Sequence, residues 1–89
     1  PGPEPKLTTR EWAIRVMQRL MGAMTTGTAE TIAVPYGYVC TNEQARFLVV
    51  DSDGKPLRAT LKRGAADNVT LRKLEDMLEE LAAKGKKTT

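Results

Sequence analysis

The predicted fold depends most on one stretch near the middle of the chain, Arg46-Phe47-Leu48-Val49-Val50-Asp51-Ser52-Asp53-Gly54-Lys55. Its first half is almost continuously apolar, which predicts a strand from Ala45 to Asp51 with both of its faces covered. The Asp-Gly dipeptide that follows is the strongest short-range signal of a β-hairpin. The next run, from Leu57 to Lys62, alternates apolar and polar residues and predicts a return strand with one face in water.

A third strand is predicted before this hairpin, from Thr31 to Thr41. Strict alternation would divide its side chains between the two faces of the sheet. One face would carry Ile32, Val34, Tyr36, Tyr38 and Cys40, and the other Ala33, Gly37 and Val39. Pro35 cannot donate a ladder hydrogen bond, so we expect this strand at a sheet edge or broken by a kink at Pro35.

The chain before the strands has two independent signals of a helix start. Thr8 is followed three residues later by Glu11, the spacing of a capping box. Leu7 and Trp12 flank this cap and can form a hydrophobic staple. These signals predict a helix from Thr9 to Met24 that stops before Gly27.

A second helix is predicted after the return strand, starting near Thr70 and ending at Gly85. Its apolar stripe, spaced for one helix face, consists of Leu71, Leu74, Leu78 and Leu81. The predicted fold class is therefore α+β, a three-stranded antiparallel sheet with two helices packed on one face, in the order α-β-β-β-α. We expect a single domain over residues 7–85, with a proline-rich flexible tail at 1–6 and a basic flexible tail at 86–89.

The first predicted helix is apolar around an unusually wide part of its circumference. At 100° per residue its apolar arc is about 200°, whereas a helix resting on one sheet needs roughly 100° or a little more. Either a second surface of the same chain covers this arc, or a second copy of the chain does. The residues predicted to form such an interface are Trp12, Val16, Met17, Leu20, Met21 and Met24. Methionine suits an adaptable contact, and the alternative is that the three methionines are ordinary core residues.

The composition argues against catalysis, metal binding and a cofactor. The 89 residues include no histidine, the commonest general base and metal ligand, and a single cysteine, Cys40. Because Cys40 lacks a second cysteine or a histidine partner, we expect a small buried hydrophobic residue rather than a reactive thiol. One cysteine, together with no visible signal peptide or membrane-spanning run, predicts a cytoplasmic protein with no membrane partner.

The basic residues offer an alternative function. The net charge is +3, which allows a polyanionic partner without demanding one. Phosphate contacts would come from the predicted hairpin and the C-terminal end, through Arg46, Lys55, Arg58, Lys62, Arg63, Lys86 and Lys87. Tyr36 and Tyr38 could stack on bases, but their predicted face also carries Ile32 and Val34, which indicates core.

These patterns lead to one leading hypothesis and one alternative. The leading hypothesis is a small non-enzymatic protein–protein interaction or assembly module that self-associates through its first helix as a homodimer or larger oligomer. The alternative is a nucleic-acid-binding accessory or regulatory protein that uses the basic sheet face and the C-terminal lysines. The two predict different responses to salt, because phosphate contacts weaken steeply as the salt concentration rises.

Overall fold

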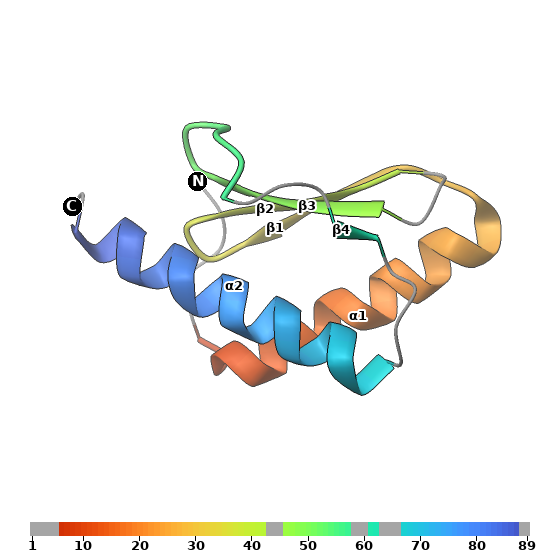
Figure 1. The fold of residues 1–89 in the computed structure, drawn as a ribbon, viewed down its shortest axis with the longest axis horizontal. Coiled ribbons are helices and arrows are strands. Elements are labelled where there is room, and N and C mark those ends of the chain that lie inside the picture. The colour runs from red at the N-terminus through yellow and green to blue at the C-terminus, as the bar shows by residue number, and fades with distance from the viewer. Residues whose placement is uncertain (1–5, 43–45, 58–60, 63–66, 88–89) are drawn as a thin grey trace.

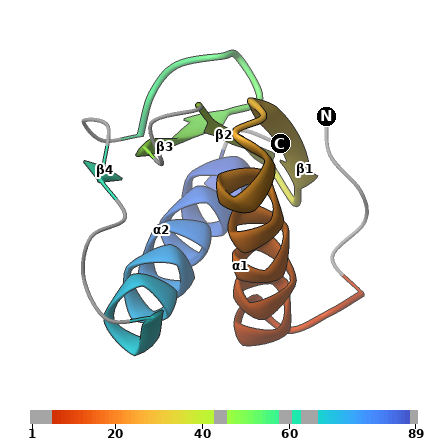
Figure 2. The same cartoon turned by 90° about the vertical axis from the view of Figure 1, so that its right-hand side faces the viewer.

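A computed structural model of the chain places two helices on one face of an antiparallel sheet (Figure 1, Figure 2). The structure describes residues 6–42, 46–57, 61–62 and 67–87. The elements in chain order are α1 (Thr9–Thr26), β1 (Glu30–Val34), β2 (Gly37–Thr41), β3 (Arg46–Asp51), β4 (Leu61–Lys62) and α2 (Asp67–Lys87). The three longer strands and the two helices confirm the α+β class and the order α-β-β-β-α. The two-residue β4 extends the sheet order to β1-β2-β3-β4.

α1 begins and ends where its sequence signals predict. The Thr8 side chain accepts a hydrogen bond from the Glu11 backbone N–H, and the Glu11 side chain accepts one from the Thr8 backbone N–H, so the capping box is formed. The helix runs two residues beyond Met24 and stops at Gly27, whose φ of 68° is left-handed. The Gly27 N–H donates to the Ala23 carbonyl, which satisfies one of the free carbonyls at the helix end.

The segment from Thr31 to Thr41 is a hairpin and not one kinked strand. Val34 pairs directly with Gly37, so Pro35 and Tyr36 form a two-residue turn between β1 and β2. Proline followed by a residue with positive φ is the pattern of a type II turn, and Tyr36 has a φ of 69°.

This turn changes which residues of β2 face the core. Directly opposed residues share a face, so Gly37 and Val39 lie inward with Val34 and Ile32. Tyr38 and Cys40 therefore lie on the outer face, half-buried, and the predicted sharing of a core face with Ile32 and Val34 is wrong.

The Asp-Gly signal after β3 is confirmed as a tight turn. The Asp51 N–H donates to the Lys55 carbonyl, and Val50 forms a bridge with Pro56 on the returning chain. The predicted return strand runs from Leu57 to Lys62. In the structure its last two residues form β4, which pairs with the start of β3. Residues 58–60 lie outside the described residues.

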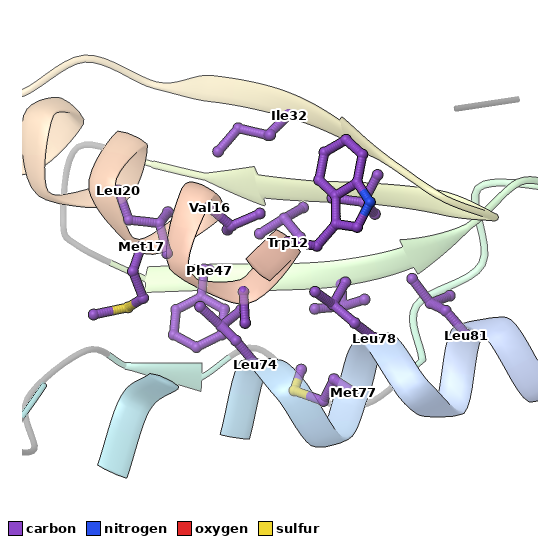
Figure 3. Packing of buried hydrophobic residues seen from close by; sticks show 14 residues of the cluster. Trp12, Val16, Met17, Leu20, Ile32, Phe47, Leu74, Met77, Leu78 and Leu81 are labelled. Carbon is purple, nitrogen blue, oxygen red and sulfur yellow. The ribbon is translucent and has the colours of Figure 1, made fainter. Parts of the chain in front are cut away.

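The hydrophobic core lies between the sheet and the helix pair (Figure 3). α1 contacts β1 and β2, α2 contacts β3, and the two helices contact each other. The inward side chains of the sheet that join this core are Ile32, Val34, Val39, Phe47 and Val49. α2 contributes Leu74, Leu78 and Leu81 of its predicted stripe together with Met77, while Leu71 of the stripe packs against the core partly buried. The helix continues past Gly85 to Lys87. Lys86 and Lys87, expected in a flexible tail, are therefore the last residues of a helix.

Candidate functional site

The apolar arc of α1 is covered mainly from within the chain. Four of the six residues predicted to form an interface belong to the core, namely Trp12, Val16, Met17 and Leu20. Their burial follows from the position of α1, which packs against both the sheet and α2 and so has two partners for its wide apolar arc. Met21 is 46% exposed, and Ile14, seven residues earlier and so on the same side of the helix two turns away, is 40% exposed. The side chain of Met24 lies outside the described residues.

A second apolar surface lies on the face of the sheet opposite the helices. We call it the outer sheet face and define it by Tyr38, Cys40, Leu48 and Val50, all half-buried. Tyr38 is directly opposite Val50 and Cys40 directly opposite Leu48, so the four side chains form two adjacent cross-strand pairs. Both helices lie on the other side, and the turn after β3 rises on this side at one end of the sheet (Figure 1).

The basic residues predicted to contact phosphate do not form one patch among the described residues. The backbone register places Lys62 opposite Arg46 at one end of β3. Lys55 lies beyond the other end of β3, about 16 Å away at 3.3 Å per residue. Lys86 and Lys87 lie at the end of α2. Arg58 and Arg63 are outside the described residues, so the nucleic-acid hypothesis stays a prediction.

A cavity of about 270 Å³ opens at the end of the molecule where β1 turns into β2. We call it the Trp12 cavity. Its walls come from the start of α1, the β1–β2 turn and the last turns of α2. The lining residues are Leu7, Thr8, Thr9, Trp12, Pro35, Tyr36, Leu78, Ala82 and Lys86. The wall is thus mostly apolar and aromatic, with one lysine at its edge.

The Trp12 side chain carries an unusual buried donor. Its ring is 7% exposed, and its Nε1–H has no hydrogen-bond partner among the residues that the structure describes. The nitrogen is on the side of the ring toward the joint between β1 and β2 (Figure 3). The Arg15 guanidinium lies over the ring, 5.4 Å from its centroid. An unpaired buried donor costs about 1–3 kcal/mol, and the same residue lines the Trp12 cavity.

Tyr36 forms the second aromatic wall and is held against α2 by a glycine. A Cβ placed on Gly85 would lie 2.6 Å from Tyr36 Cγ and 2.9 Å from Tyr36 Cβ, both closer than real Cβ contacts. The ring therefore packs directly on the α2 backbone. Positive φ in a bulky residue costs free energy, and such strain persists only where surrounding contacts hold it. The contact with Gly85 is such a contact.

An ion pair fixes the same part of α2 to the sheet. Lys84 Nζ lies 2.7 Å from Asp51 Oδ2, and the Asp51 side chain is only 9% exposed. Asp51 Oδ1 also accepts hydrogen bonds from the backbone N–H groups of Lys55 and Asp53. The hydrogen bond from Lys84, then that from Lys55, lowers the pKa of Asp51, and Asp51 in turn raises the pKa of Lys84. The part of α2 that lines the Trp12 cavity is therefore fixed to the end of β3 by this ion pair.

The described residues form neither a metal site nor a membrane-spanning helix. Across residues 6–42, 46–57, 61–62 and 67–87, no cluster of three or more His, Cys, Asp or Glu side chains is arranged to hold a metal ion. Neither described helix combines the length and the apolar character that crossing a membrane requires.

The sequence predicts Trp12 at an interface and Tyr36 in a strand, and neither prediction indicates the cavity that the two residues share. Two signals pointed toward it. Pro35-Tyr36-Gly37 has proline at the first position of a turn, and Gly85 interrupts an otherwise good helix sequence. Neither signal reveals that the turn and the glycine meet, because that contact depends on how α2 packs.

Comparisons with known protein families, curated proteins and solved structures found no match to this chain.

Proposed function

We propose that this chain is a small non-enzymatic assembly module whose outer sheet face packs against a second copy of the chain. The observation that supports it most directly is the two cross-strand apolar pairs on that face, with Tyr38 directly opposite Val50 and Cys40 directly opposite Leu48. An antiparallel sheet with one open face normally carries polar side chains there. On β3 the outward positions between Arg46 and Asp51 are instead leucine and valine.

A second copy is a suitable cover because the face is nearly uncharged and can pack on itself. A two-fold axis brings the same patch of both copies together, so one apolar face satisfies both partners. Two sheets packed in this way stand about 10 Å apart with their side chains interdigitated. Arg46 lies exposed at the margin of the face, where solvent can still reach its charge.

The size of the face limits the strength of this association. Even with β1 included, three strands spaced about 4.8 Å apart and about five residues long give this side of the sheet an area of about 240 Å². Stable interfaces bury about 800 Å² on each partner, and much smaller ones belong to weak, transient complexes. We therefore expect a reversible dimer that forms as the protein concentration rises, rather than an obligate one.

This proposal keeps the self-association expected from the sequence and moves its surface from α1 to the sheet. Leu20, the natural residue to mutate in the α1 hypothesis, is 2% exposed, so a charge there would unfold the chain. Met21 is the fair test of α1 because it is 46% exposed.

Sedimentation equilibrium over a wide concentration range tests the proposal. The wild-type mass should rise toward twice 9.8 kDa, and Leu48→Lys should keep the mass at the monomer value while the circular dichroism stays that of the wild type. Met21→Lys, the matched lysine substitution on α1, should dimerise like the wild type. The outer sheet face is not the interface if Met21→Lys alone dissociates the dimer, and there is no assembly function if the wild type stays monomeric throughout.

A further inference from the structure

Three independent features of the described chain meet at the Trp12 cavity, which lies on the helix side of the sheet, away from the outer sheet face. They are the cavity itself, the buried and unpaired Nε1–H of Trp12, and the positive φ of Tyr36. A cavity, an unsatisfied buried donor and backbone strain are each more common at functional sites than elsewhere. Their coincidence makes this end of the molecule the place in the described chain where a binding site is best sought.

The dimensions of the cavity limit what it can hold. About 270 Å³ is just below the range of sites that enclose a drug-sized molecule. It suits one or two side chains of an extended peptide, with the rest of the peptide lying outside. The site therefore fits a segment of another protein better than a free cofactor.

The walls indicate which side chains would enter. The ring systems of Trp12, Tyr36 and Pro35 line one region, and Leu78 and Ala82 close it from α2. Aromatic walls of this kind are what domains that bind polyproline II segments offer to proline rings. Such a segment has no internal hydrogen bonds, so each of its carbonyls is free to accept one.

The unpaired indole fits this class of ligand. Trp12 Nε1–H is a donor only, and a peptide carbonyl would satisfy it. The nitrogen atom is covered in the present structure, so a lining side chain must turn aside before a carbonyl can reach it. A ligand that both pairs this donor and fills the cavity recovers the free energy that the buried donor costs.

The positive charge at the edge of the Trp12 cavity favours a ligand that carries acidic residues. Lys86 lines the cavity and Lys87 follows it, both exposed at the end of α2. The chain as a whole is also positive, at +3. An acidic residue next to the prolines of the ligand would therefore be attracted to this rim.

From these observations we propose that the Trp12 cavity binds a proline-containing, acidic segment of a partner protein, with a segment carbonyl accepting from Trp12 Nε1–H. This binding site is separate from the outer sheet face and does not depend on self-association.

Fluorescence anisotropy with a labelled peptide that repeats Pro-Pro-Glu tests the proposal on the full chain. Two control peptides of equal length replace either the prolines by alanine or the glutamates by lysine. The acidic proline peptide should bind about tenfold more tightly than either control, because each control removes one of the two recognition elements. Equal binding of the three peptides, or no binding of the first, would overturn the proposal.

Variants of the protein then locate the bound peptide. Ala82→Leu fills the cavity and should weaken binding about tenfold or more, whereas the same change at the neighbouring exposed Ala83 should have no effect. Trp12→Phe keeps an aromatic ring but removes the donor, and should weaken binding about two- to tenfold. Lys86→Glu should weaken it about threefold at low salt, and less at high salt.

The outcomes separate the competing occupants. Peptide binding that is unchanged by Ala82→Leu places the peptide elsewhere and refutes the cavity as its site. If the double variant Pro3→Ala, Pro5→Ala binds the peptide about tenfold more tightly than the wild type, the occupant is the proline-rich segment before Leu7 in this chain. That result would overturn the assignment to a partner protein. The Leu48→Lys variant, which we expect to be monomeric, should bind the peptide as tightly as the wild type does.

Discussion

Two turns lie side by side at one end of the sheet and are held in opposite ways. The turn after β3, residues 52–55, is satisfied by its own atoms. Asp51 accepts from the Asp53 and Lys55 N–H groups at 2.9 Å each, and Gly54 supplies the positive φ of 82° without steric cost. The turn between β1 and β2 has Tyr36 where a glycine would fit best.

The two turns differ in whether nearby residues or a distant helix stabilise them. The ring of Tyr36 rests on Gly85, so the strained turn depends on a helix that is far away in the sequence. The turn after β3 also reaches α2, through the Asp51–Lys84 ion pair, but its hydrogen bonds would form without that helix. The locally satisfied turn serves as an anchor, and the strained turn forms a wall of the Trp12 cavity.

Gly85→Ala should lower the free energy of unfolding the most, because it removes the packing contact that holds the strained turn at Tyr36. The new Cβ would collide with Tyr36 and force the turn away from α2, at a cost of about 1–3 kcal/mol. Gly22→Ala is the matched control, since Gly22 is also helical and its Cβ would meet nothing within 4 Å. That variant should be more stable by about 0.5–1 kcal/mol. Urea unfolding measures both, and equal shifts would refute the contact between Tyr36 and Gly85.

Asp51→Ala should have the next largest effect, because it removes both the anchor of α2 and the hydrogen bonds of the turn after β3. The nearby exposed Asp53→Ala is the control, since its carboxylate is not part of that ion pair. We expect the thermal midpoint of Asp51→Ala to fall clearly and that of Asp53→Ala to change little. Similar midpoints for the two variants would show that the ion pair does not anchor α2.

The pH dependence of stability should isolate the ion pair itself. Asp51 has a folded pKa below its ordinary value of 3.8, so its contribution is present above that pH and is lost as the pH falls through the folded pKa. Lys84 has a folded pKa above its ordinary 10.5, so its contribution is lost as the pH rises through the folded pKa.

The pair should therefore stabilise the fold fully between about pH 4 and pH 10. Lys84→Met should reduce the loss of stability at both ends of this range, as measured by urea unfolding across pH. Glu11, whose pKa is lowered by its capping hydrogen bonds, should still give some acid dependence in this variant. An unchanged alkaline limb in Lys84→Met would contradict the assignment.

Gly54→Ala should lower the free energy of unfolding the least. It measures what a positive φ costs in the turn after β3, for comparison with Tyr36. Its Cβ would meet nothing within 4 Å, so the cost comes only from the positive φ and should be roughly 1 kcal/mol. Tyr36 already bears this kind of cost in the wild type. A loss well above 2 kcal/mol would show that the turn after β3 also depends on packing.

Much of the fold could be predicted because its signals are local. The capping box at Thr8, the left-handed Gly27 and the Asp53-Gly54 turn each depend on atoms within a few residues of one another. The leucine stripe of α2 likewise follows from helix periodicity. Such features form in the same way whatever the rest of the chain does.

The candidate sites could not be predicted, because each joins segments that are distant in the sequence. The wide apolar arc of its helix predicts Trp12 at an interface, and only the positions of α2 and the sheet show that most of the arc is covered within the chain. Strict alternation predicts Cys40 in the core, whereas the two-residue turn at Pro35 and Tyr36 places it on the outer sheet face. A shift of one residue in register reverses the faces of a strand, which local patterns around a proline do not decide.

The sequence by itself determined the helix caps, the Asp-Gly turn and the order of the elements, because backbone hydrogen bonding and periodicity act over short distances. Only the tertiary structure decided that Tyr36 rests on Gly85 and that Leu48 and Val50 face away from the helices. It also decided that the buried Trp12 donor has no partner in the part of the chain that the structure describes. Those outcomes depend on which surfaces meet when two helices share one face of a small sheet. Which surfaces meet is decided by the packing of the whole core, because the elements that form it contact one another.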